Sequence, residues 1–236
     1  MHYDYKQKLN KIDSEKYRNL KVPEIDWKLN EAQEVFVKII AEPRFKSQLG
    51  FETNQRTIDD IRTIVVNQSF SKGTCSTPTV YDDSSYLTVL PEDYWYRIAS
   101  KVIATKGNCA NRELRAVPME HDDETELSPF DKSSFEWKHS NFRFINEGIR
   151  SFTDGTFTIN KFCLDYIRRP QLIHNAQDWQ GGTYTLLDGT VLIGSQDCEL
   201  PVGIHREIVD LAVLITSGDL SLPDYQLKVF KTKLTQ

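Results

Sequence analysis

The first third of the chain has the hydrophobic spacing of helices. After Val22-Pro23, apolar positions recur at steps of mostly three and four between charged ones: Leu29, Ala32, Phe36, Ile39 and Ile40. This spacing predicts an amphipathic helix, because residues three or four apart share one helix face. Asn54 is a suitable N-cap for a second helix, with the apolar stripe Ile58, Ile61 and Ile64/Val65. We therefore expect residues 1–66 to form an N-terminal helical region.

The segment before these helices, YDYKQKLNKIDSEKYRNL, is strongly charged. Its weak apolar stripe consists of Tyr5, Leu9, Ile12 and Tyr17. A helix with so narrow a stripe buries little surface by itself. We expect this segment to be either a frayed arm or a helix that docks on a neighbouring molecule.

From about Thr77 the pattern changes to that of strands. TPTVY and YLTVL are short runs of β-forming residues, and Tyr94–Thr105 is a longer one. In the longer run one face carries Tyr96, Ile98, Val102 and Ala104, and the other carries Arg97, Lys101 and Thr105. This alternation predicts an antiparallel strand with one solvated face.

Two Asp-Gly dipeptides predict hairpin turns, because they adopt the positive φ angles of a type I′ turn easily. Asp154-Gly155 lies within RFINEGIRSFTDGTFTINKFCLDYI, and Asp188-Gly189 lies within GTYTLLDGTVLIG. Between the strands, VPMEHDDETELSPF is acidic and bounded by prolines. We expect that segment to be a helical turn or an exposed loop.

The end of the chain again has helical spacing. Pro201 suits a first helical position, and an apolar stripe follows at Ile204, Ile208, Leu211 and Ile215. Ser221 can cap a last helix from Pro223, with the apolar face Leu227, Phe230 and Leu234. The sequence thus predicts an α+β fold: N-terminal helices (1–66), a central antiparallel β-sheet or sandwich core with hairpins and an inserted acidic loop (67–197), and a C-terminal helical pair (198–236). We expect one compact domain with an N-terminal helical arm.

Composition narrows the classes of function. The 236 residues carry a formal net charge of −5, which disfavours a protein that binds free nucleic acid. No apolar run approaches the ~18 residues of a membrane span, and the N-terminus lacks the apolar region of a secretory signal. The four cysteines, at 75, 109, 163 and 198, fit no zinc or redox spacing. We expect free thiols and a protein made in a cytoplasm.

The densest group of reactive side chains is CELPVGIHREIVDLAV, residues 198–213. His205 and Glu207 are two positions apart and point away from each other on a helix. A zinc-protease helix needs a second histidine four positions after the first, where this chain has Val209. Arg206 and Asp210 have the spacing of a solvent-facing ion pair. We therefore expect a packed helix start here, with no catalytic residues, no cofactor and no metal.

Two other groups leave alternatives open. The segment MEHDDETE, residues 119–126, could bind a divalent cation through His121, Asp122, Asp123 and Glu124, as in a metal-dependent hydrolase. It lacks the ligand periodicity and the glycine of a calcium loop, which favours a solvated acidic loop. The chain has no P-loop, no dinucleotide-binding glycine motif and no nucleophile elbow. A β-rich carbohydrate-binding or receptor-binding tail module would use exposed aromatic residues, for which the candidates are Trp179, Tyr184 and Trp137.

Four segments together resemble a known family. They are LPEDYWYRIASKVIA (90–104), SPFDKSSF, FTINKFCLDYIRRPQLI (157–173) and CELPVGIHREIVDLAV. In this order they resemble the head-to-tail connector, or neck ring, proteins of tailed double-stranded DNA phages, most closely those of crAss-like phages. The similarity covers roughly residues 85–236.

The resemblance implies a structural protein of the virion without catalysis. Such proteins form closed rings, often of twelve copies, beneath the portal protein, and continue the channel through which the double-stranded DNA leaves. The implied partners are further copies of the chain, the portal protein and adjacent neck or tail rings, with no membrane. Candidate contacts are the N-terminal helix, the acidic loop 119–126, the C-terminal pair 201–234, and Arg168 and Arg169, since arginine is enriched at interfaces.

Overall fold

The computed structural model describes residues 1–10, 20–41, 59–71, 86–120, 131–146 and 148–219. They fall into two compact units. We call Met1–Ile64 with Pro170–Gln236 the helical unit, and Val65–Arg169 the sheet unit. Together they confirm the predicted α+β class, with helices at both ends of the chain and a large sheet between them. The predicted domain boundaries at residues 66 and 197 stay a prediction, because the two units are groups of residues that pack together and need not fold independently.

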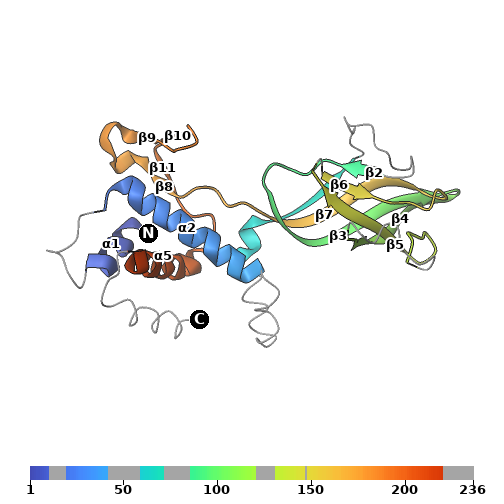
Figure 1. Cartoon of the computed structure of the whole chain (residues 1–236), viewed down its shortest axis with the longest axis horizontal. Helices are drawn as coiled ribbons and strands as arrows, with labels where there is room; N and C mark the ends of the chain where they lie inside the picture. Colours follow the sequence, from blue (N-terminus) through green and yellow to red (C-terminus); the bar gives the residue numbers. More distant parts are fainter. Residues whose placement is uncertain (11–19, 42–58, 72–85, 121–130, 147, 220–236) are drawn as a thin grey trace, which may run out of the picture. The chain divides into compact units, whose positions relative to one another are not determined.

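The helical unit consists of α1 (His2–Asn10), α2 (Val22–Ala41), the 3-10 turn η1 (Arg62–Ile64) and α5 (His205–Asp219), which follows the 3-10 turn η5 (Val202–Ile204). The remainder is β8 (His174–Asn175), η3 (Ala176–Asp178), η4 (Gln180–Gly182), β9 (Thr183–Thr185), β10 (Val191–Ile193) and β11 (Ser195–Gln196). α5 packs on one side of α2, and the β8–β11 segment lies on the other (Figure 1).

Local sequence explains where α2 begins and what it buries. The Glu24 carboxylate accepts a hydrogen bond from the Lys21 backbone N–H at 2.8 Å, which satisfies a donor just before the first turn. The buried face contains Ile25, Leu29, Ala32, Phe36 and Val37. Three of the five predicted stripe residues are therefore buried, whereas Ile39 and Ile40 are only partly so.

α5 confirms the predicted C-terminal helix but not the details of its stripe. Ile204 and Ile208 are buried as predicted, but Leu211 and Ile215 are only half-buried. The buried face continues instead through Val209, Ala212, Val213 and Thr216. The helix packs against both α1 and α2, so its buried surface is wider than a single stripe. The predicted helix at 223–234 lies outside the described residues.

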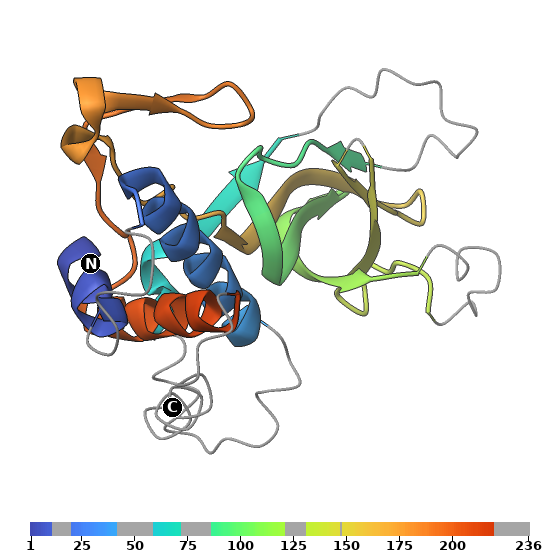
Figure 2. The ribbon, with the colours of Figure 1, turned by 60° about the vertical axis from the view of Figure 1, so that its left-hand side comes forward.

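The sheet unit is a seven-stranded, strongly curved sheet (Figure 2). In spatial order its strands are β1 (Val65–Phe70), β7 (Thr158–Arg168), β3 (Tyr94–Lys106), β4 (Cys109–Pro118), β5 (His139–Ile145), β6 (Gly148–Ser151) and β2 (Tyr86–Thr88). One face encloses a core rich in phenylalanine, in which Phe142 and Phe162 meet edge to face with ring centroids 5.6 Å apart.

The predicted long strand is present as β3, but bulges shift its alternation. The register with β7 slips between Tyr94 and Tyr96 and again between Arg97 and Ala99. Val102 and Ala104 lie beyond these slips and are buried, whereas Ile98 is exposed. A bulge adds one residue to a strand and reverses the faces on either side of it. The predicted common face of Ile98 and Val102 is therefore wrong.

Two strand pairings differ from the prediction. β6 and β7 do not form a hairpin around Asp154-Gly155, because β6 pairs with β5 and β2, while β7 pairs with β1 and β3. The turn itself is real: Asp154 Oδ1 accepts a hydrogen bond from the Thr156 backbone N–H at 2.8 Å, and Gly155 has φ 77°. The core is also not wholly antiparallel, since β4 and β5 run parallel.

The second predicted hairpin is confirmed. β9 and β10 pair in antiparallel register, Leu192 opposite Tyr184, and Gly189 has φ 87° in the turn. The YLTVL run contributes β2, whereas TPTVY and the second helix from Asn54 to Ile58 lie outside the described residues. Residues 59–61 are helical, but Val65 already belongs to β1 and does not extend a helical stripe.

No helix in the described part of the chain is long and apolar enough to cross a membrane.

Candidate functional site

The N-terminal helix α1 packs inside the helical unit. Tyr5 is fully buried, and its hydroxyl lies 2.6 Å from Thr216 Oγ1 of α5. Thr216 donates its own hydrogen to the Ala212 carbonyl, so the Tyr5 hydroxyl is the donor. Lys8 forms an ion pair with Asp210 at 2.5 Å. The expectation of a frayed or externally docked helix is therefore wrong for His2–Asn10, because one tyrosine with a buried partner anchors an otherwise polar helix.

A buried carboxylate joins α1, α2 and the β-hairpins. Asp26 on α2 is 2% exposed and accepts three hydrogen bonds. The donors are His2 Nε2 at 2.5 Å, the Asn175 backbone N–H at 3.1 Å and the Tyr184 hydroxyl at 2.6 Å. Burial and the bond to Asp26 raise the pKa of Tyr184 above its ordinary value. A buried charge is tolerated when it is fully hydrogen-bonded, as it is here.

Two of these residues, Asp26 and Tyr184, also line a groove between α2 and the β9–β10 hairpin. The groove has a volume of about 500 Å³ and is lined mainly by apolar side chains. Trp27 and Leu187 are its most exposed apolar members, at 58% and 99%. Glu31 and Glu34 lie on its α2 side. An exposed apolar groove with a charged margin is typical of a site that receives another protein segment.

Comparison with known proteins identifies the family. The family model described as phage tail ring protein 3/4 matches residues 4–221, nearly the whole chain. The chain belongs to this family. A search of curated proteins found none that matches.

Membership confirms the resemblance to phage ring proteins. The match begins at residue 4, so it also includes the N-terminal third, which the similarity at 85–236 left out. The ring protein is thus a structural component of a phage virion, and its copies assemble into rings.

The cluster at 198–213 is used for packing in this ring protein. His205 Nε2 donates to the Leu200 carbonyl at 2.8 Å, at the start of α5. Cys198 is buried and lies 3.4 Å from Gln33 Oε1, and burial raises the pKa of its thiol to about 11. Asp210 bonds to Lys8, not to the predicted partner Arg206. A protonated thiol and a histidine that donates to a backbone carbonyl do not make a nucleophile and its base.

The predicted acidic metal site cannot be placed. His121, Asp122, Asp123 and Glu124 lie outside the described residues, and of the loop 119–126 only Met119 and Glu120 are described. Within the described ranges, no three side chains of histidine, cysteine, aspartate or glutamate gather closely enough to hold a metal ion.

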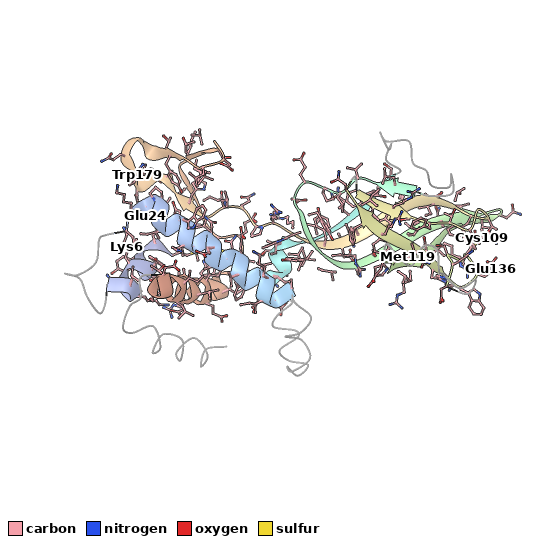
Figure 3. All side chains as sticks on the ribbon, viewed as in Figure 1. Lys6, Glu24, Cys109, Met119, Glu136 and Trp179 are labelled. Carbon is pink, nitrogen blue, oxygen red and sulfur yellow. The ribbon has the colours of Figure 1, made fainter. Side chains whose placement is uncertain are left out.

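The three aromatic candidates for carbohydrate binding belong to two different units. Trp179 lies near the first turn of α2, where Glu24 is found (Figure 3), and the Lys21 ammonium is 6.0 Å from its ring. Tyr184 is half-buried and bonded to Asp26. Trp137 belongs to the sheet unit and is 79% exposed.

Arg168 and Arg169 end β7, where the chain leaves the sheet unit. The Arg169 backbone N–H donates to the Asp93 carbonyl at 2.8 Å, and its side chain is exposed. Arg168 Nη1 donates to the Arg169 carbonyl at 3.4 Å. The two residues remain candidates for an interface.

Sequence reasoning missed the groove itself, although the polar-apolar alternation of TYTLLDGTVLI places apolar residues on both faces of a hairpin that cannot bury both by itself.

Proposed function

We propose that this chain is a subunit of a closed ring in the head-to-tail connector, between the portal protein and the tail. The observation that supports this is the match of the phage tail ring protein family over residues 4–221. The ring continues the DNA channel and performs no catalysis. The chain is synthesised in the cytoplasm of the host bacterium and ends in the neck of the virion.

Ring closure requires a heterologous contact, in which one patch of a subunit meets a different patch of the next. We expect on the order of twelve copies, arranged to match a portal ring. The formal net charge of −5 suits a channel that double-stranded DNA passes without being held through its phosphates. The acidic loop 119–126 and the C-terminal pair 201–234 are the candidate segments for contacts with the portal protein or an adjacent ring.

Cryo-electron microscopy of intact virions, with mass spectrometry of the purified particles, tests this function. The expected result is a ring of this chain directly below the portal, with a copy number equal to that of the portal or a simple multiple of it. Absence from virions would contradict a structural role. A position at the distal tail tip would contradict the connector role and support the receptor-binding alternative. Elemental analysis that finds a stoichiometric divalent metal would support the hydrolase alternative.

A further inference from the structure

Exposed apolar side chains concentrate at the groove of the helical unit. Among the described residues, ten large apolar side chains are exposed, and five of them lie on α2, on the β9–β10 hairpin or in the segment just before β8: Trp27, Leu172, Leu187, Val191 and Ile193. Trp27, Leu172 and Leu187 line the groove itself. Scattered exposed hydrophobic residues need no explanation, but such a cluster marks a contact surface.

The hairpin is stable in this position only because its inner face is held. Tyr184 and Leu192 point inward, and the Tyr184 hydroxyl bonds to the buried Asp26. Two-stranded hairpins are marginal in water without such packing. The groove is therefore pre-formed, which lowers the entropic cost of binding a partner.

The margin of the groove is acidic and lies next to the end of α5. Glu31 and Glu34 line it from α2, and the exposed Glu34 also pairs with Lys38 at 3.3 Å. Lys28 bonds to Glu31 at 2.8 Å and also to Asp219, the last described residue, at 2.5 Å. The segment 220–236 therefore leaves the described structure beside this margin.

The sequence of that segment complements the groove. After Asp224 it contains no acidic residue, and it carries Lys228, Lys231 and Lys233. Leu227, Phe230 and Leu234 recur at steps of three and four, the spacing by which an amphipathic helix enters an apolar groove. The lysines match the carboxylates at the margin in charge.

We propose that the groove of one subunit receives the C-terminal segment 220–236 of the neighbouring copy. This inference rests on the proposed ring function, because it supplies the heterologous contact that a ring needs: groove and segment are two different patches of one chain. Leu227, Phe230 and Leu234 fill the groove, and the lysines face Glu31 and Glu34.

The first test measures binding of a labelled 220–236 peptide to the chain truncated after Asp219, by fluorescence anisotropy. We expect saturable binding that weakens with added salt and falls at least tenfold in the double variant Trp27→Glu, Leu187→Asp. The matched control is Tyr3→Glu, since the exposure of Tyr3, 73%, lies between those of Trp27 and Leu187 but the residue is on α1, and the affinity of this variant should be unchanged. Absence of binding, or equal loss in the control, would overturn the proposal.

The second test distinguishes a neighbouring copy from the chain's own segment. The truncated chain keeps the groove, and the Trp27→Glu, Leu187→Asp variant keeps the segment. In sedimentation equilibrium each should be a monomer alone, and an equimolar mixture should form a species of two chains and nothing larger. The full wild-type chain, which has both groove and segment, should in contrast associate further as its concentration rises. Two monomers in the mixture would overturn the proposal, and so would a wild-type chain that stays a monomer at every concentration, since its segment would then occupy its own groove. The position of the protein in the virion is measured separately, so a failed contact test leaves the connector function standing.

Discussion

The bond between Tyr184 and Asp26 should contribute strongly to the stability of the helical unit. Substitution of Tyr184 by Phe removes a hydroxyl that donates to a buried carboxylate at 2.6 Å and leaves the ring in place. Hydrogen bonds to charged groups are worth about 1.5–3 kcal/mol, and Tyr184 is half-buried, so we expect a loss of about 2 kcal/mol in the free energy of unfolding.

Urea unfolding followed by circular dichroism at 222 nm is the appropriate assay, because the described α-helices all belong to the helical unit. With a slope of about 2 kcal/mol per molar urea, the midpoint should fall by about 1 M. The matched control is Tyr3→Phe, which removes the hydroxyl of an exposed tyrosine and should change stability by less than about 0.5 kcal/mol.

A double-mutant cycle makes the test specific. If the two side chains interact as described, Asp26→Asn and Tyr184→Phe should be non-additive by at least about 1 kcal/mol. Tyr184→Phe within about 0.5 kcal/mol of the wild type, or additive effects in the cycle, would refute the reasoning. It would show that the hairpin is held by apolar packing alone.

Three further predictions concern other parts of the chain. Gly148→Ala should destabilise the sheet unit by about 3 kcal/mol, because Gly148 has φ +141° and an added Cβ would lie 2.1 Å from a backbone oxygen of β2. Urea unfolding followed by tryptophan fluorescence measures this loss. The control Gly155→Ala, with open space around the added Cβ, should destabilise the protein less. In a Cys75→Ser background, Ellman's reagent should modify the exposed Cys109 at once and Cys198 only on unfolding. The reason is that burial shields the Cys198 thiol and raises its pKa to about 11. Rapid reaction of two thiols in the folded protein would contradict this prediction. Burial and the bond to Asp26 raise the folded pKa of Tyr184 above 10.0, so the folded state holds this proton to higher pH than the unfolded state. The contribution of Tyr184 to stability is therefore complete below about pH 10 and declines above it, and the Tyr184→Phe variant should show a smaller fall in stability between pH 9 and 11.

Local signals in the sequence identified most elements but not their partners. The helices at 22–41 and 205–219, the long strand from Tyr94 and the hairpin at Asp188-Gly189 follow from periodicity and turn chemistry, which are properties of neighbouring residues. The Asp154-Gly155 turn shows the limit, because a turn forms there, with positive φ at Gly155 but not at Asp154, while its flanking strands pair elsewhere. Strand pairing depends on contacts far apart in sequence, and no local pattern determines it.

The candidate site could be predicted even less. Asp26 meets His2, Asn175 and Tyr184 from three distant segments, and each of these residues is unremarkable in its local context. Strand β4 was also missed, although Gly107-Asn108 between alternating runs is a recognised hairpin signal. In contrast, the apolar spacing after His205 was sufficient to predict a packed helix there, and the structure has that helix, with the His205 side chain donating to the Leu200 carbonyl just before it.

The way the chain enters and leaves the sheet unit bears on how this protein can evolve. Val65, at the start of β1, is paired directly with Ile167, near the end of β7. Cα atoms of such antiparallel partners lie about 5 Å apart, so the whole of 66–166 is an insertion whose two ends are neighbours. An insertion whose ends are adjacent can be lost, enlarged or exchanged without moving the two chain ends to which it is joined in the helical unit. Recombination could therefore replace the sheet in one step while the groove and the C-terminal segment, which both belong to the helical unit, pass on unchanged.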